Sequence, residues 1–399
     1  MHVVLINQFY PPAKAPTGRL LQDLARGLVA AGHQVTVIAS DAAYGVTGSA
    51  EKAAGGEGLR ILRVGGRRRH GFGMLAKALD YLSFFKAAYA RCKQLNPAPD
   101  ALVCMTTPPF IGLVGYQLRR KRNIPYLLWC MDLYPEALSA HGLLRPGFLL
   151  NPLAKGISRM ERRNASSVVS LGPDMSGLLA KNGCSGVCEI PVWSDIKTSP
   201  ESLSRARALR RERGWGDEEC IVMYSGNMGR AHRVSEAAAL ARQVRKTSRP
   251  VRVIFCGDGP ARAGWERDHG DVIEFMTPYA GDDLAAHLLS ADVHLVTQEP
   301  VWTGVVVPSK FQAACAVGRP VIFAGPEHAS VARWIEEHDC GWVIAPDNQQ
   351  AVYHVAELLA DRDELQAKGE HAAALSRNLF DAAENRQKII ALLEQMANT

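Results

Sequence analysis

Long apolar runs, low-complexity segments and a secretory signal are all missing from this sequence. No stretch of about 18 or more uncharged apolar residues occurs in the chain, which argues against a transmembrane helix. Met1 leads directly into the apolar run 2–6, with no basic region and no cleavage site, and this is unlike a signal peptide. We therefore expect a cytoplasmic protein.

Cysteine is present but forms no metal-binding pattern. The nine cysteines are scattered, mostly inside apolar runs, where a free thiol behaves as a small hydrophobic residue. Cys184 and Cys188 are the only close pair, and no second pair or histidine cluster completes a zinc site. We expect reduced thiols, no bound metal and no resident cofactor.

Basic residues outnumber acidic ones and are clustered. The formal net charge is +6, and basic runs occur at 67–69, 119–122, 159–163 and 205–213. Such runs are either solvated helix faces or a surface for an anionic partner. Because no nucleic-acid-binding module accompanies them, we expect an anionic membrane surface and no nucleic acid. The protein would then lie peripherally at the inner face of the membrane.

Short β-branched runs alternate with longer helical stretches, a pattern typical of parallel sheets covered on both faces. A segment rich in proline and serine, 191–200, separates two series of runs. We predict an α/β protein with two Rossmann-like, doubly wound domains, 1–195 and 196–377, facing a cleft. A C-terminal helix, 378–399, could pack back on the first domain. The predicted strands are 3–6, 35–38, 59–64, 101–105, 126–129, 167–170, 221–224, 251–255, 273–275, 293–296, 320–323 and 341–344.

Several motifs occur at the expected ends of these strands. In the first domain, Phe-Tyr-Pro-Pro ends at residue 12, Thr17-Gly18-Arg19 begins a helix with Thr17 as the expected N-cap, and Ala-Gly-His-Gln-Val-Thr-Val covers 31–37. A glycine at position 18 would let backbone N–H groups approach a phosphate or a sugar. The second domain contains Met-Tyr-Ser-Gly-Asn-Met-Gly-Arg (223–230), Phe-Cys-Gly-Asp-Gly-Pro (255–260), Ala-Asp-Val (291–293), Pro-Ser-Lys (308–310) and Gly-Arg-Pro-Val (318–321).

In this order, the motifs resemble the family-four glycosyltransferases, which have the GT-B fold. Within that family they resemble the branch that builds bacterial surface polysaccharides of the colanic acid and O-antigen type. The resemblance implies a retaining, metal-independent hexosyltransferase. It implies that the first domain binds a lipid-linked or saccharide acceptor and the second binds the nucleotide-sugar, a UDP- or GDP-sugar.

A departing diphosphate needs positive charge where its own charge develops, and Lys310 at the start of a helix is suited to this role. The alternative is a lysine exposed on a helix. Either Arg230 or Arg233 would supply a second cation, and Ser309 would either cap the helix or contact a phosphate. The expected donor-binding residues are Gly18, Gly226, Asn227, Gly229, Arg230, Arg233, Gly257, Ser309 and Lys310.

The sequence departs from the family at a glutamate that relatives use on the ribose. Ala313 occupies that position, while Glu299 lies several residues before the other acidic position. The ribose contacts therefore stay open.

Two carboxylates in the first domain are catalytic candidates. Asp132 follows a predicted strand. It either acts on the substrate, by orienting the acceptor hydroxyl or stabilising positive charge on the reacting sugar, or caps a helix that starts at Pro135. Glu136 lies in the first turn of that helix.

An apolar stretch from Phe72 to Leu95, preceded by Arg67–Arg69, has helical periodicity. Its large side chains are expected either in the core or in a membrane interface. These side chains are Leu75, Leu79, Leu82, Phe84, Phe85 and Tyr89.

Two other functions fit the predicted fold. One is a sugar-nucleotide epimerase, and the other is a non-catalytic protein that binds sugar nucleotides.

Overall fold

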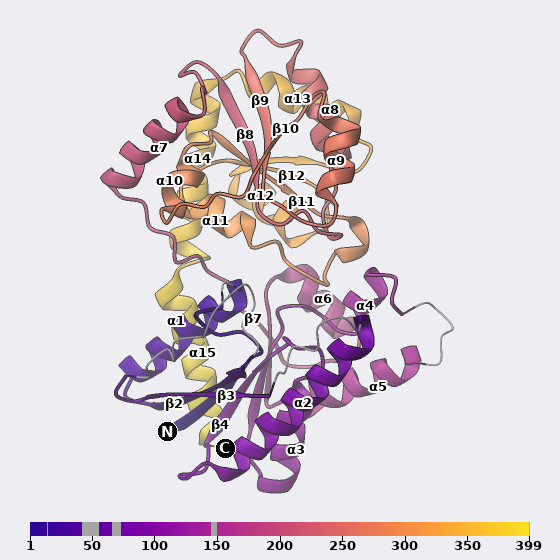
Figure 1. Ribbon diagram of the computed structural model, residues 1–399, viewed down its shortest axis with the longest axis vertical. Helices are drawn as coiled ribbons and strands as arrows, with labels where there is room; N and C mark the ends of the chain where they lie inside the picture. Colours follow the sequence, from indigo (N-terminus) through magenta and orange to yellow (C-terminus); the bar gives the residue numbers. More distant parts are fainter. Residues whose placement is uncertain (14, 42–55, 66–72, 145–149, 399) are drawn as a thin grey trace. The chain divides into compact units, whose positions relative to one another are not determined.

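The computed structural model describes residues 1–13, 15–41, 56–65, 73–144 and 150–398 (Figure 1). The chain forms two compact units. Unit 1 comprises Met1–Pro191 and Ala383–Thr399, and unit 2 comprises Val192–Ala382.

Unit 1 contains a seven-stranded parallel sheet with the order β3-β2-β1-β4-β5-β6-β7. Its strands are β1 (His2–Ile6), β2 (Gln34–Ser40), β3 (Leu59–Val64), β4 (Ala101–Met105), β5 (Tyr126–Trp129), β6 (Ser167–Ser170) and β7 (Val187–Glu189). The first six coincide with predicted runs. The seventh was not predicted, because it has only three residues, all partly or fully exposed, and therefore lacks an apolar signal.

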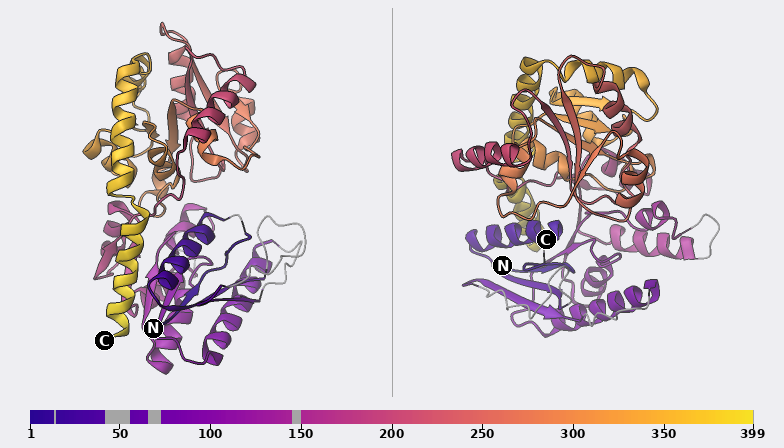
Figure 2. Two further views of the ribbon diagram at one scale, coloured as in Figure 1. Left: turned by 90° about the vertical axis from the view of Figure 1, so that its left-hand side faces the viewer. Right: turned by 45° about the horizontal axis from the view of Figure 1, so that its top comes forward.

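Helices cover this sheet. They are α1 (Pro16–Ala30), α2 (Gly73–Gln94), α3 (Gly112–Arg122), α4 (Glu136–Ala140), α5 (Leu150–Arg163), α6 (Pro173–Lys181) and α15 (Ala382–Ala397). The last of these lies beside α1 (Figure 2, left), where Arg386 Nη1 is 2.7 Å from the Asp23 carboxylate. Ile389, Ile390 and Leu393 of α15 are buried, so the last helix of the chain completes the core of unit 1.

Unit 2 contains a six-stranded parallel sheet with the order β10-β9-β8-β11-β12-β13. Its strands are β8 (Cys220–Ser225), β9 (Val251–Cys256), β10 (Glu274–Met276), β11 (Val293–Thr297), β12 (Val321–Ala324) and β13 (Gly341–Ile344), and each matches a predicted run to within a residue or two. Its helices are α7 (Pro200–Glu212), α8 (Ser235–Val244), α9 (Arg262–His269), α10 (Leu284–Leu289), η1 (Pro300–Trp302), α11 (Lys310–Ala316), α12 (Ser330–His338), α13 (Gln349–Leu358) and α14 (Arg362–Asn378).

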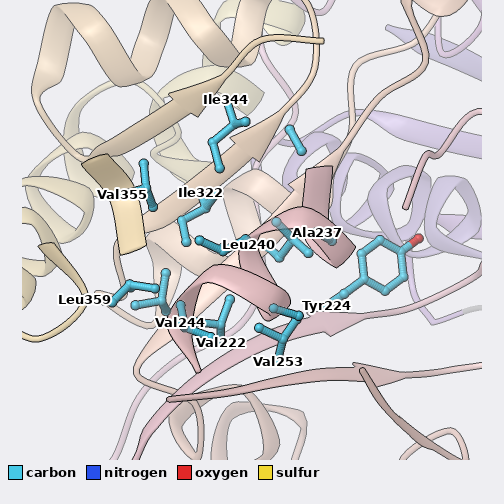
Figure 3. Packing of buried hydrophobic residues seen from close by; sticks show 14 of the residues in the cluster. Val222, Tyr224, Ala237, Leu240, Val244, Val253, Ile322, Ile344, Val355 and Leu359 are labelled. Atoms are coloured by element: carbon cyan, nitrogen blue, oxygen red, sulfur yellow. The ribbon is translucent and has the colours of Figure 1, made fainter. Parts of the chain in front are cut away.

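One face of this second sheet packs on α8 and α13 (Figure 3). Ala237, Leu240, Ala241 and Val244 of α8 recur at helical spacing and are all buried. They meet Val222, Val253 and Ile322 of the strands, and each fully buried large aliphatic side chain contributes about 1.5–3 kcal/mol. Tyr224 lies at one edge of this cluster (Figure 3), close to the end of β8.

Each sheet reverses its strand order beside its first strand. In unit 1, β1 pairs with both β2 and β4, and in unit 2, β8 pairs with both β9 and β11. Ligands of open parallel sheets bind beyond the carboxyl ends of the strands at such reversals. The segments that follow β1 and β4, and those that follow β8 and β11, are therefore the places to look for function.

Candidate functional site

Lys310 begins α11 but is not an exposed helix lysine. Its Nζ is 3.1 Å from His232 Nε2 and 5.0 Å from the centre of the Tyr224 ring. Burial lowers the pKa of Lys310 to about 8. No carboxylate among the described residues forms an ion pair with it. A sheltered cation whose neighbours are neutral is suited to an anionic ligand.

Two glycines let the loops after β8 and β9 close on each other and on this lysine. Gly226 has φ +138°, and a Cβ there would lie 2.6 Å from Lys310 Cε. A Cβ at Gly257 would lie 1.9 Å from the Gly226 carbonyl oxygen. At Gly257 the contact is with backbone, which cannot move aside, and at Gly226 the positive φ is one that other residues rarely adopt, so both positions favour glycine.

The other predicted residues of the β8 loop lie near these glycines. Asn227 is exposed, and its carbonyl oxygen accepts a hydrogen bond from the Tyr224 hydroxyl at 2.6 Å. A Cβ at Gly229 would lie 2.8 Å from Asn227 Nδ2. Ser309 occupies the N-cap position of α11, but its side chain makes no capping hydrogen bond and it is exposed.

The two candidate arginines differ in their surroundings. Arg233 is largely buried, and its guanidinium donates to the buried Glu236 carboxylate at 2.6 and 2.7 Å. The Glu299 carboxylate, 39% exposed, is 3.8 Å from Arg233 Nη1. Arg230 is exposed. Glu236 already compensates the charge of Arg233, which leaves that arginine less available to a diphosphate.

Ala313, at the position where the resemblance led us to expect a glutamate, is partly buried on α11. Its neighbour Gln312 is buried, and neither polar atom of its amide has a hydrogen-bond partner among the described residues.

Two groups near the end of β8 were not predicted. One is His232, which follows the quoted motif at 223–230 but gives no sequence signal by itself. The other is Ser225, whose Oγ is 2.9 Å from His287 Nε2, while His287 Nδ1 is 3.0 Å from Arg213 Nη2. Since arginine only donates, His287 Nδ1 accepts, and Nε2 donates to Ser225. The Ser225 hydroxyl hydrogen thus stays available to a ligand.

In unit 1, Gly18 lies against the segment that follows β1. A Cβ there would lie 3.2 Å from backbone atoms of Phe9 and Tyr10, so glycine lets the first turn of α1 approach this loop. The predicted cap at Thr17 is wrong. The helix begins at Pro16 with Ala15 as its N-cap, because a proline is pre-organised for the first helical position.

Asp132 follows β5, and its backbone is fixed by the segment after β4. Thr106 Oγ1 accepts from the Met131 and Asp132 N–H groups at 2.8 and 3.1 Å. The capping alternative is wrong, since α4 begins at Glu136 with Pro135 as its N-cap, and no described residue donates to the Asp132 carboxylate. Burial raises the pKa of Asp132 to about 6.

Aromatic rings accompany Asp132. Burial, followed by the charge of Asp132, raises the pKa of Tyr134. The ring of Phe110 is 6.2 Å from that of Tyr134, and Phe110 itself has φ +64°, which is rare for a non-glycine residue. An acid beside aromatic rings, at the end of a parallel strand, is suited to a sugar.

Glu136 has close partners instead. Its carboxylate lies 3.2 Å from Arg162 Nη2 and accepts from Asn182 at 2.7 Å. The same Arg162 nitrogen donates to the Tyr134 carbonyl at 2.7 Å. These contacts attach the segment that follows Asp132 to α5, so Glu136 contributes to the position of that segment.

The stretch from Phe72 to Leu95 forms α2 from Gly73 to Gln94. Phe84 is buried as a core residue, but Leu79 and Leu82 are 41% and 52% exposed, so a core position for these two is wrong. The three arginines at 67–69 lie outside the described residues.

The described residues offer neither a membrane-spanning helix nor a cluster of metal ligands. They contain no helix long and apolar enough to cross a membrane. They also contain no group of three or more histidine, cysteine or acidic side chains placed to hold a metal ion.

Comparison with family models gives two matches. Residues 17–193 match the model described as a glycosyl transferase 4-like domain. Residues 219–361 match the model described as glycosyl transferases group 1. The first match lies within unit 1 except for its last two residues, and the second lies within unit 2.

Individual proteins are similar over most of their length. The probable glycosyltransferase WbjE of Pseudomonas aeruginosa is 21% identical over 70% of this chain and 70% of that protein. The putative colanic acid biosynthesis glycosyl transferase WcaI of Escherichia coli is 22% identical over 84% and 86%. The crystal structure of Anabaena HepE in complex with UDP-glucose has a TM-score of 0.69 at 17% identity, covering 99% of this chain and 100% of that one.

Proposed function

Since the chain belongs to the GT-B glycosyltransferases described by these two domain models, we propose that it moves a hexose from a nucleotide-sugar to a lipid-linked or saccharide acceptor, with retention of anomeric configuration. The acceptor product would enter a cell-surface polysaccharide or glycolipid. The names of WbjE and WcaI support a glycosyltransferase, and that of WcaI supports polysaccharide synthesis.

One observation carries the donor half of this proposal. The Lys310 ammonium is sheltered, has neutral neighbours and lies against the loop at Gly226, where no side chain intervenes. The reaction releases a nucleoside diphosphate, whose charge increases as the sugar–phosphate bond breaks. A cation held beside the phosphate oxygen that leaves the sugar stabilises the transition state more than the ground state. The UDP-glucose bound to HepE supports a uridine nucleotide as the first donor to test.

The acceptor half depends on Asp132. A carboxylate that titrates near neutral pH can accept a proton from an attacking hydroxyl, or it can stabilise positive charge on the reacting sugar. The rings of Phe110 and Tyr134 offer an apolar face to a sugar ring. In this proposal Asp132 is the catalytic acid–base and Glu136 positions it through Arg162.

We further propose that the reaction needs no metal ion, because Lys310 and Arg230 supply the positive charge that a divalent ion would otherwise supply. The exposed Leu79 and Leu82, with Lys77 and Lys86 on the same helix, support a peripheral contact of α2 with an anionic membrane. Each basic residue near such a surface contributes about 1 kcal/mol, which gives reversible binding.

The test is incubation of the purified protein with radiolabelled UDP- and GDP-hexoses, with and without lipid-linked saccharide extracts. Label that moves to the acceptor with its anomeric configuration retained is the expected result. Label that returns as an isomeric nucleotide-sugar would show an epimerase. Donor that binds but never reacts with any acceptor would contradict the catalytic proposal.

A further inference from the structure

His232 connects the last residue of β11 to Lys310. Its Nδ1 is 2.8 Å from the Thr297 carbonyl oxygen, and its Nε2 is 3.1 Å from Lys310 Nζ. A carbonyl oxygen can only accept, so Nδ1 carries the hydrogen. A neutral imidazole then has its lone pair on Nε2, and Lys310 donates to it. The tautomer of His232 is thus set by its two partners.

The imidazole stays neutral in this environment. Burial, followed by the positive charge of Lys310, lowers the pKa of His232 to about 3, against the opposite effect of the Thr297 carbonyl. The Tyr224 ring packs against it edge-on, with ring centres 5.6 Å apart. His232 is therefore an acceptor for Lys310 at any pH near neutrality.

We propose that His232 is a positioning residue, which fixes the Lys310 ammonium for an incoming nucleoside diphosphate without neutralising it. The proposal rests on the proposed role of Lys310 as the cation for the donor. One ammonium hydrogen goes to His232, and the others remain for phosphate oxygens.

A second lysine of unit 2 shows the contrast. Lys368 Nζ lies 2.6 Å from the Asp339 carboxylate and 3.3 Å from that of Glu364. Two carboxylates compensate its charge and leave little attraction for another anion. A neutral histidine 3.1 Å away also holds Lys310 by a hydrogen bond but preserves its charge. This difference separates a lysine that stabilises the fold from one that is ready to bind a ligand.

The two nitrogens of His232 can be replaced one at a time. In His232→Asn, the shorter amide can still donate to Thr297, but nothing reaches Lys310. In His232→Gln, the longer side chain can place its amide oxygen where Nε2 was, and the contact with Thr297 is lost. His294→Asn is the matched control, since this histidine is buried on the neighbouring β11 and contacts the Leu288 carbonyl, not Lys310.

Two measurements test the inference. In the ligand-free protein, competitive acetylation followed by mass spectrometry reports the pKa of Lys310. Loss of the acceptor in His232→Asn should lower that pKa by about one, because the ammonium loses a hydrogen bond, and His232→Gln should restore it. Calorimetry with UDP and GDP should show affinity about ten-fold weaker in His232→Asn and within about three-fold of wild type in His232→Gln and His294→Asn.

A double-mutant cycle separates positioning from a general effect on the fold. In a Lys310→Met background, His232→Asn should change nucleotide affinity by less than about two-fold, because its effect passes through the lysine. An equal loss in both backgrounds, or a Lys310 pKa that is the same in wild type and His232→Asn, would overturn the inference. Wild-type protein that binds neither UDP nor GDP would overturn the proposed function, and the labelling would still decide whether His232 controls Lys310.

Discussion

Replacing Lys310 with methionine should make the protein more stable while weakening its affinity for the nucleotide. Burial lowers the pKa of this lysine from 10.5 to about 8. At about 1.4 kcal/mol per pKa unit, the charged form costs the folded state about 3 kcal/mol at neutral pH. Because the side chain keeps some contact with solvent, we expect about 1–2 kcal/mol in practice. Methionine keeps an unbranched apolar stem, and its sulfur can contact the aromatic ring of Tyr224 in place of the ammonium.

The gain should depend on pH in a defined direction. Between about pH 8 and pH 10.5 the unfolded chain holds a proton on Lys310 that the folded protein has released. The stability of the wild type therefore rises with pH relative to Lys310→Met across this window. The advantage of the variant is largest below pH 8 and disappears as pH approaches 10.5.

Thermal unfolding and calorimetry measure both effects. At pH 7 the variant should melt about 2–8 °C higher than wild type. Its dissociation constant for UDP should rise about 10- to 150-fold, the range expected for a lost hydrogen bond to a charged group. Wild-type affinity should itself fall as pH rises through about 8, because the bare amine no longer attracts phosphate.

Lys368→Met is the control, because its ammonium is paired with two carboxylates. That variant should lose stability and keep its affinity for UDP. A Lys310→Met protein that melts below wild type at pH 7, or that binds UDP equally well, would refute the reasoning that Lys310 is a cation kept for a ligand.

Three other predictions concern the remaining parts of the proposed site. Asp132→Asn should lower kcat about 100-fold or more with little change in nucleotide affinity. It should also remove the rise of wild-type activity through about pH 6, where the carboxylate loses its proton. A variant with the wild-type pH profile would exclude Asp132 as the acid–base. Transfer should continue in excess EDTA, and activity that is abolished by the chelator and restored by Mg²⁺ or Mn²⁺ would contradict metal independence. Replacing the exposed Leu79 and Leu82 with glutamate should weaken sedimentation with anionic vesicles without lowering the melting temperature. Phe84→Glu, by contrast, should unfold the first unit, because that side chain is buried. Equal vesicle binding by wild type and the double variant would leave α2 with a structural role alone.

Most of the sheet architecture could be predicted from the sequence, because continuous β-branched runs are buried on both faces of a parallel sheet. The strands from Val3 to Ile344 illustrate this, and among the strands of the described residues the short β7 is the one that was missed. The start of α1 was wrong by two residues, since the pattern favoured Thr17 as a cap while the proline at position 16 already fits the first turn.

The chemistry of the site was less accessible to sequence reasoning. The motif Pro-Ser-Lys indicated Lys310, but not that its partners would be neutral groups from two other segments. Periodicity identified α2 but could not say that Leu79 and Leu82 lie on its exposed side. Likewise, no local pattern reveals that Glu236 engages Arg233, or that Arg162 and Asn182 engage Glu136. Such contacts depend on residues distant in sequence.

The return of α15 to unit 1 has a consequence for synthesis on the ribosome. Residues 1–191 leave the ribosome first but lack the helix that buries Ile389, Ile390 and Leu393 against them. Unit 2 is continuous from Val192 to Ala382 and has all its strands before that helix is made. Domains usually fold from the N-terminus as they emerge. The first unit is thus completed only after the second, so a chain that ends at Ala382, where α15 begins, would have a finished second unit and a first unit that lacks this helix.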